Sequence, residues 1–182
     1  MNLSVALIGN PNSGKSSLFN LLTGMNQRVG NFPGVTVDRT LGTFNLPNKT
    51  PVSLIDLPGT YSLYPVSQDE RIACEIIWDK THQDHANVWI IVIDATQLRR
   101  GLLLCSQMID LGLPIVVALN MIDMLESNGQ RIDAQKLARQ LEVPVVAISA
   151  RKNLGIDLLL QTISQKIQPD RKSTRLNSSH VD

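Results

Sequence analysis

The feature of the sequence that most restricts the fold is a glycine-rich segment between a strand pattern and a helix pattern. Residues 3–8 form an apolar run typical of a buried strand, and residues 15–22 are typical of a helix. The residues between and around them are Gly9-Asn10-Pro11-Asn12-Ser13-Gly14-Lys15-Ser16, which match G-x-x-x-x-G-K-S. In this strand–loop–helix context the pattern predicts a loop whose backbone N–H groups hold phosphates. A tight turn without a ligand is the alternative.

Two side chains of this loop have expected roles. Lys15 is expected to reach the β- and γ-phosphates of a nucleotide, and the Ser16 hydroxyl is expected to bind Mg²⁺. The other residues expected to line the nucleotide here are Asn10, Pro11, Asn12, Ser13, Gly14 and Ser17.

The rest of the chain alternates strand and helix patterns. Apolar strands at 88–93, 115–119 and 143–148 are separated by helices at 98–111 and 134–141. This order predicts a mostly parallel sheet that is covered by helices on both faces. Strands at 39–46 and 52–55, joined by a turn at 47–49, are expected to add one antiparallel edge strand, which makes six strands. Residues 26–35, rich in Gly, Asn and Pro, are expected to form a loop.

Composition excludes several classes of protein. The chain has 182 residues, 43% of them hydrophobic and 18% charged, which suits one domain with a real core. A net charge of +1 gives no basic surface for nucleic acid, so no nucleic-acid partner is expected. Two cysteines, Cys74 and Cys105, are too few for a disulfide framework and are expected to be buried thiols. With no signal peptide and no membrane-length apolar run, these residues alone are expected to be soluble and cytoplasmic.

A second phosphate-facing segment follows the strand at 52–55. Asp56 begins a D-x-x-G pattern and is expected to face Mg²⁺ through a water, while the Gly59 N–H is expected to contact a γ-phosphate. In the loop before it, Thr36 is the hydroxyl expected on Mg²⁺ in the triphosphate state, and Thr40 is the competing choice. An Asp-Pro-Gly turn without a ligand is the alternative for this segment, and an Asn or Asp cap after a strand is the alternative for residues 120–123.

Two further segments follow strands and indicate a base-binding site. Asp123, in the segment Asn120-Met121-Ile122-Asp123, can accept hydrogen bonds from N1–H and the 2-amino group of guanine, and adenine offers no such pair. Asn120 is expected to tie this loop to the phosphate loop. The pair Ser149-Ala150 is expected to let a backbone N–H approach the guanine O6. Because all these segments lie at carboxyl ends of strands, they predict a three-layer, Ras-like P-loop GTPase fold.

With these residues assembled, the chain resembles the cytosolic G domain of FeoB-type bacterial ferrous iron transporters, over residues 3–167. The segments that carry the resemblance are 9–16, 29–36, 56–63 and 120–123, with Met121 where related GTPases usually have Lys. The resemblance implies binding of GTP and GDP with Mg²⁺, slow hydrolysis, and K⁺ activation with Asn12 as a K⁺ ligand. It also implies a helical regulatory domain, a polytopic membrane domain, a site at the cytoplasmic side of the inner membrane, and homo-oligomers among its partners.

The catalytic residues expected from this site are few. Thr60 stands where Ras-like proteins have a water-orienting Gln, so catalysis is assigned to Lys15, Asn12 and the Gly59 N–H.

The chain divides into a G domain at 1–168 and a polar tail at 169–182, interpreted as linker or adaptor- or vector-derived sequence. The alternatives are a stand-alone GTPase acting on RNA or ribosomes, and a module that binds nucleotide without hydrolysing it. An ATPase or small kinase is disfavoured by Asp123. Arg28, Arg39, Arg99 and Arg100 are expected to be solvated, as are His82, Asp84 and His85.

Overall fold

The computed structural model describes residues 3–167, and the tail expected at 169–182 lies outside this range. Seven strands form one sheet in the order β2-β3-β4-β1-β5-β6-β7. The parallel part of the sheet is made of β4 (Pro51–Asp56), β1 (Ser4–Gly9), β5 (Val88–Asp94), β6 (Ile115–Asn120) and β7 (Val145–Ala147). β3 (Asp38–Asn45) pairs antiparallel with β4, and β2 (Gln27–Asn31) pairs antiparallel with β3.

The sheet therefore has one strand more than the six predicted. The sequence placed a loop at 26–35, but Gln27–Asn31 form the edge strand, and the predicted antiparallel strand lies one position inside the edge. All five residues of β2 are exposed, so the segment has no apolar pattern that could distinguish it from a loop.

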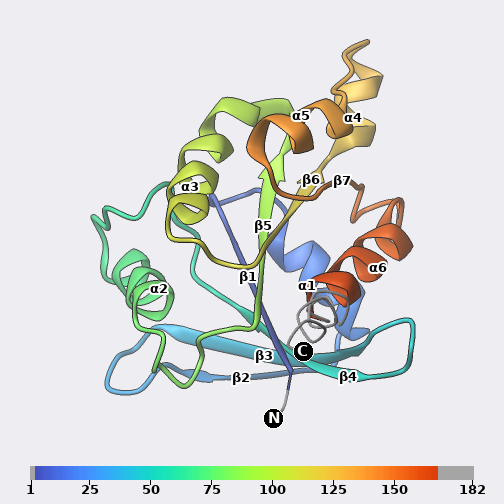
Figure 1. The fold of residues 1–182 in the computed structure, drawn as a ribbon. Helices are drawn as coiled ribbons and strands as arrows, with labels where there is room; N and C mark the ends of the chain where they lie inside the picture. The colour runs from blue at the N-terminus through green and yellow to red at the C-terminus, as the bar shows by residue number, and fades with distance from the viewer. Residues whose placement is uncertain (1–2, 168–182) are drawn as a thin grey trace, which may run out of the picture.

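Helices cover both faces of the sheet (Figure 1). On one face, α1 (Lys15–Thr23) and α6 (Ile156–Ile167) bury Leu18 and Leu159 against Val5 and Val116 of the sheet. On the other face, α2 (Gln68–Trp78) and α3 (Leu98–Asp110) bury Ile76 and Leu104, and α5 (Ala134–Leu141) packs at the margin through Leu141. The result is the three-layer arrangement that the sequence predicted.

Burial on both faces of the sheet explains why the central strands could be predicted from their continuous apolar runs. On β1, Val5 and Leu7 face the α1–α6 side, while Ala6 and Ile8 face the α2–α3 side. Because both faces are covered, the strand is apolar at every position instead of at every second one.

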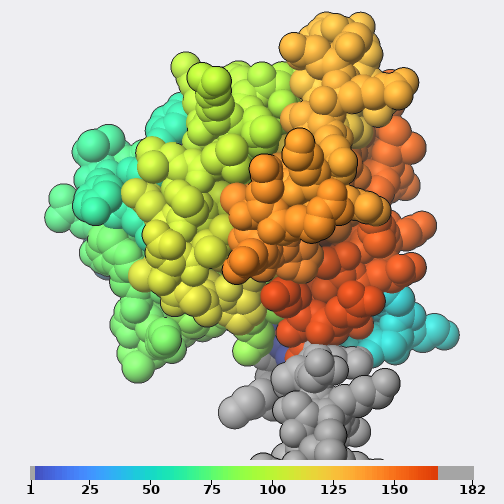
Figure 2. All heavy atoms as spheres, turned by 45° about the horizontal axis from the view of Figure 1, so that its top comes forward, coloured from blue at the N-terminus to red at the C-terminus, as the bar shows by residue number. Residues whose placement is uncertain are grey.

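One short helix, α4 (Ile122–Ser127), has no counterpart in the predicted elements. It follows β6 directly, with the short 3-10 helix η1 (Ala95–Gln97) beside it. In Figure 2 the gold and orange segment that contains α4 and the turn after it projects from the surface. Within residues 3–167 no helix is both long and apolar enough to cross a membrane.

Candidate functional site

The phosphate loop lies between the end of β1 at Gly9 and the start of α1 at Lys15. Gly14 has a left-handed backbone (φ 91°), and a Cβ there would lie 2.2 Å from Asn120 Nδ2. A Cβ on Gly9 would lie 2.3 Å from the Val92 carbonyl oxygen. Both glycines are therefore required by close contacts, and at Gly14 also by conformation.

Polar atoms without partners gather in this loop. Asn10 Oδ1 and Ser13 Oγ are buried and make no hydrogen bond within residues 3–167. Both residues line a pocket of about 100 Å³ that the loop shares with Tyr61, the end of β5 and the start of α3. Polar groups left unpaired in this way favour a site that water or a polar ligand completes.

Lys15 and Asp56 face each other across the phosphate loop. Lys15 Nζ lies 3.4 Å from Asp56 Oδ1, and both side chains are largely buried. Burial raises the pKa of Asp56, and the neighbouring Lys15 ammonium offsets only part of that rise. Asp56 Oδ1 has no hydrogen bond among the described residues. A second cation near this carboxylate would therefore be stabilising, and Mg²⁺ prefers oxygen donors such as this carboxylate and the Ser16 hydroxyl.

The segment after Asp56 is held against β1 and the phosphate loop. Thr60 N donates to Gly9 O at 3.0 Å, and a Cβ on Gly59 would lie 3.0 Å from Pro11 N. The Thr60 side chain is fully buried and donates to Ser62 O at 2.7 Å. Since this hydroxyl points into the protein, it is not placed to orient an attacking water.

Thr36 lies apart from these groups. It is exposed in the turn between β2 and β3, and among residues 3–167 no hydrogen bond connects it to Ser16 or Asp56. The competing residue, Thr40, is paired with Asp56 in the register of β3 and β4. The role of Thr36 on Mg²⁺ stays a prediction.

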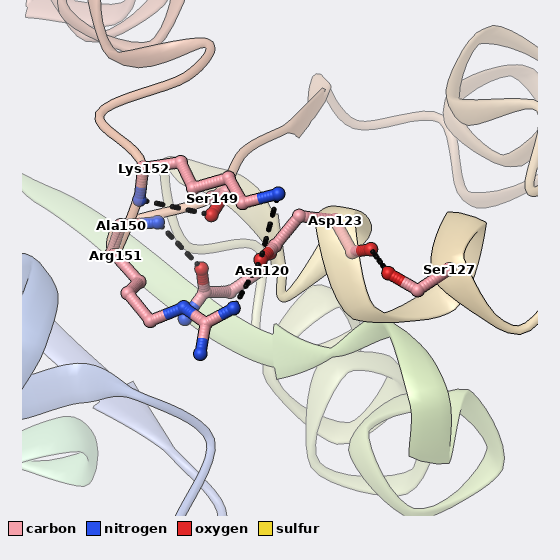
Figure 3. Close-up of polar contacts among 7 residues, drawn as sticks. All are labelled: Asn120, Asp123, Ser127, Ser149, Ala150, Arg151 and Lys152. Atoms are coloured by element: carbon pink, nitrogen blue, oxygen red, sulfur yellow. Dashed lines mark hydrogen bonds and ion pairs between the residues drawn. The ribbon is translucent and has the colours of Figure 1, made fainter.

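Asn120 connects the three loops of the site, and Figure 3 shows its hydrogen bond with Ala150. Its Nδ2 donates to Ser13 O at 3.1 Å, and its Oδ1 accepts from Ala150 N at 3.0 Å. The side chain is buried, and it joins the end of β6 to the phosphate loop on one side and to the segment after β7 on the other. The hydrogen bond to Ser13 is the tie to the phosphate loop that the sequence predicted, and the hydrogen bond with Ala150 was not predicted.

Asp123 carries an ion-paired carboxylate at the start of α4. Its side chain is 5% exposed, and Oδ2 accepts from Arg151 Nη2 at 3.1 Å, with Lys152 Nζ at 3.9 Å (Figure 3). The Ser149 hydroxyl and Arg151 hold the pKa of Asp123 below its ordinary value, although burial opposes them. Met121, left-handed with φ 63°, lies two positions before Asp123, and its Cε would be 3.5 Å from a Cβ added at Gly14.

Arg151 and Lys152 were missed by the sequence reasoning, because a basic pair after a strand has no signal of its own. Arg39 and Asp84 correct another expectation, since they are not solvated. The Arg39 guanidinium binds both oxygens of the buried Asp84 carboxylate and joins β3 to the loop after α2. The His85 ring meets the Trp89 ring edge to face, with the ring planes 68° apart. Among residues 3–167 no group of three His, Cys, Asp or Glu side chains could hold a metal ion.

The fold and the order of these segments on the strand ends define a P-loop GTPase domain of the Ras-like type. A family model described as "Ferrous iron transport protein B" matches residues 3–163. The chain belongs to this family.

One curated relative and two solved structures are similar to this chain. The Fe(2+) transporter FeoB of Legionella pneumophila (strain Paris) is 46% identical over 96% of this chain and 24% of that protein. The solved cytosolic domain of L. pneumophila FeoB is 48% identical, with a TM-score of 0.84 over 91% of this chain and 64% of that one. A point mutant of S. thermophilus NFeoB bound to GDP is 45% identical, with a TM-score of 0.81 over 90% and 62%. This chain thus spans about a quarter of the curated relative's length.

Proposed function

We propose that this chain binds GTP and GDP with Mg²⁺ and serves as the regulatory GTPase domain of a bacterial ferrous iron transporter. The observation that carries the proposal is the pair of hydrogen bonds made by Asn120, to Ser13 O and from Ala150 N. They join the phosphate loop to the end of β6 and to the segment after β7. Asp123, three residues after Asn120, is a buried carboxylate that can accept both hydrogen bonds offered by the guanine edge. The GDP-bound S. thermophilus relative supports the same assignment.

The residues divide the work of binding. Backbone N–H groups of residues 10–17, except the proline at position 11, surround the phosphates, Lys15 neutralises their charge, and Asp123 accepts two hydrogen bonds from the guanine edge. Ser16, Asp56 and, in the triphosphate state, Thr36 are the residues that would hold Mg²⁺, which supplies charge neutralisation at the phosphate oxygens. The Ala150 N–H already donates its hydrogen bond to Asn120 Oδ1, so Ser149 and Ala150 contribute to the base pocket chiefly through their small side chains.

The test of this binding is competition for a labelled guanine nucleotide. Unlabelled GDP and GTP are expected to displace labelled GDP, and ATP at equal concentration is not. Asp123→Ala is expected to remove the preference for guanine and to retain a weak affinity through the phosphates. Equal displacement by ATP and GTP in the unmodified protein would reject the proposal.

Hydrolysis is proposed to be slow and stimulated by K⁺. Because the Thr60 side chain points inward, Lys15, the Gly59 N–H and Mg²⁺ remain as stabilisers of the transition state. Asn12, exposed at the phosphate loop with φ 63°, is the proposed K⁺ ligand through its amide oxygen. A phosphate-release assay is expected to give a higher rate in K⁺ than in Na⁺, and Asn12→Ala is expected to equalise the two rates.

A second candidate function is nucleotide binding without hydrolysis, and the inward orientation of Thr60 favours it. Lys15→Ala separates the two. If the unmodified chain releases phosphate faster than this variant, it is a GTPase. If the two release phosphate equally slowly while GTP still binds, it is a binding module.

Iron transport and its partners are properties we propose for the longer protein. A helical regulatory domain and a polytopic membrane domain are expected beyond the quarter of the relatives' length that this chain covers. The domain would then act at the cytoplasmic side of the inner membrane and associate with further copies of itself. Sedimentation of the longer protein with and without GTP tests the self-association.

A further inference from the structure

The carboxylate proposed to bind guanine already has a partner in this structure. Arg151 Nη2 donates to Asp123 Oδ2 at 3.1 Å, and Lys152 Nζ lies 3.9 Å from the same oxygen (Figure 3). The Asp123 side chain is 5% exposed, whereas Arg151 is 75% exposed. Arg151 therefore reaches a nearly buried carboxylate from the solvent side.

Guanine has to approach the carboxylate from the same side. Its N1–H and 2-amino group need one lone pair on each oxygen of Asp123, and only a small part of the carboxylate is open. The Ser149 hydroxyl already stabilises the charge on this carboxylate, and the Arg151 guanidinium adds to that. A charged donor on Oδ2 is a stronger partner than a neutral ring N–H.

We propose that Arg151 is a displaceable counter-ion that competes with the guanine base for Asp123. When the nucleotide leaves, the guanidinium replaces the base and gives the nearly buried carboxylate a charged hydrogen-bond donor. The competition lowers the affinity for guanine nucleotides and favours release of GDP. This inference rests on the proposed guanine binding.

Lys152 offers a matched control on the same loop. Its side chain is 53% exposed and its ammonium lies beyond hydrogen-bonding distance of Asp123, while its backbone N–H donates to Ser149 Oγ at 3.2 Å. Lys152→Gln removes the same charge as Arg151→Gln but no hydrogen bond to the carboxylate.

The expected result is tighter binding in the arginine variant. Arg151→Gln is expected to bind GDP about two- to fivefold more tightly than the unmodified chain, the effect of one exposed ion pair, and Lys152→Gln to change the affinity less. The difference is expected to shrink as an inert salt is raised at constant K⁺ and Mg²⁺, because salt screens the competing pair. Titration calorimetry with GDP on the full chain measures both.

A second variant separates competition from direct contact with the base. In Asp123→Asn, the amide can donate to the 2-oxo group of xanthine, so this variant is titrated with xanthosine diphosphate. Adding Arg151→Gln to it is expected to change the affinity less than it does beside Asp123, because the charge that Arg151 neutralises is absent.

Three outcomes would overturn the inference while guanine binding stands: unchanged GDP affinity in Arg151→Gln, weaker binding, or an equal gain in Lys152→Gln. Weaker binding would mean that Arg151 contacts the bound base. If the unmodified chain does not prefer GDP to ADP, the proposed function itself fails, which is a different result. Equal melting temperatures of the variants in the absence of nucleotide exclude misfolding.

Discussion

At the scale of single residues, the buried carboxylate of Asp56 suits a bound cation but lowers the folding stability of the protein without one. Burial raises the pKa of this carboxyl above its unfolded value, so its ionised form is disfavoured in the folded protein. The stability associated with it is full below the unfolded pKa and is lost as pH rises through the folded pKa. At pH 7 the charge is therefore a cost, which a neutral side chain of the same shape removes.

Asp56→Asn is accordingly expected to raise the Tm of the nucleotide-free protein by a few degrees at pH 7 and to weaken its response to Mg²⁺. Thermal unfolding followed by circular dichroism, with and without Mg²⁺ and GDP, measures both effects. At pH 3, where the carboxyl is protonated, the two proteins should melt at nearly the same temperature. A lower Tm for the variant at pH 7 would show that the Lys15 ion pair outweighs the burial of the charge.

A second prediction at the scale of residues concerns the reactivity of the two cysteine thiols. Burial raises the pKa of each thiol to about 11, for Cys74 with the help of Glu70 and Glu75. Since the thiolate is the reactive form, neither thiol should react with a disulfide reagent at pH 8 in the native protein. Both should react after unfolding in guanidinium chloride, so a colorimetric count near zero before and near two after is expected. Rapid labelling of the native protein would contradict the burial of the thiols.

At the scale of elements, the Arg39–Asp84 ion pair fastens β3 to the loop between α2 and β5. The Asp84 side chain is 4% exposed, so removing it leaves Arg39 without a partner in a partly buried position. Asp84→Ala is expected to cost about 3 kcal/mol of unfolding free energy in urea. The double variant with Arg39→Ala should lose clearly less than the sum of the two single losses. Additive losses would mean that the pair contributes no coupling.

Elements also show what the sequence could and could not predict. The buried strands β1, β5 and β6 were predicted because an uninterrupted apolar run can be recognised in the sequence alone. The edge strand β2 was not, because its exposed residues are fixed by hydrogen bonds to β3 instead of by burial. The ion pairs of Arg39 and Arg151 join residues 45 and 28 positions apart, and no local pattern encodes such partners. The phosphate loop and Asn120 could be predicted because their spacing to the strand ends is local.

At the scale of the whole molecule, the site draws on β1, β4, β6 and the segment after β7, which span the parallel part of the sheet. A ligand that binds all of them stabilises the entire folded state by mass action. At 100 times the dissociation constant the gain is about 2.7 kcal/mol, which corresponds to a Tm increase of about 5–10 °C for a domain of this size. Scanning calorimetry with GDP and Mg²⁺ is expected to show one cooperative transition that moves upward with GDP concentration, while ADP moves it little. If GDP instead split the transition in two, the regions of the sheet that form the site would be unfolding separately, and the coupling through Asn120 would be weak.

The same scan on Asn120→Ala tests this coupling, because that variant keeps Lys15 and Asp123 but lacks both hydrogen bonds between the loops, so its GDP-induced shift is expected to be smaller.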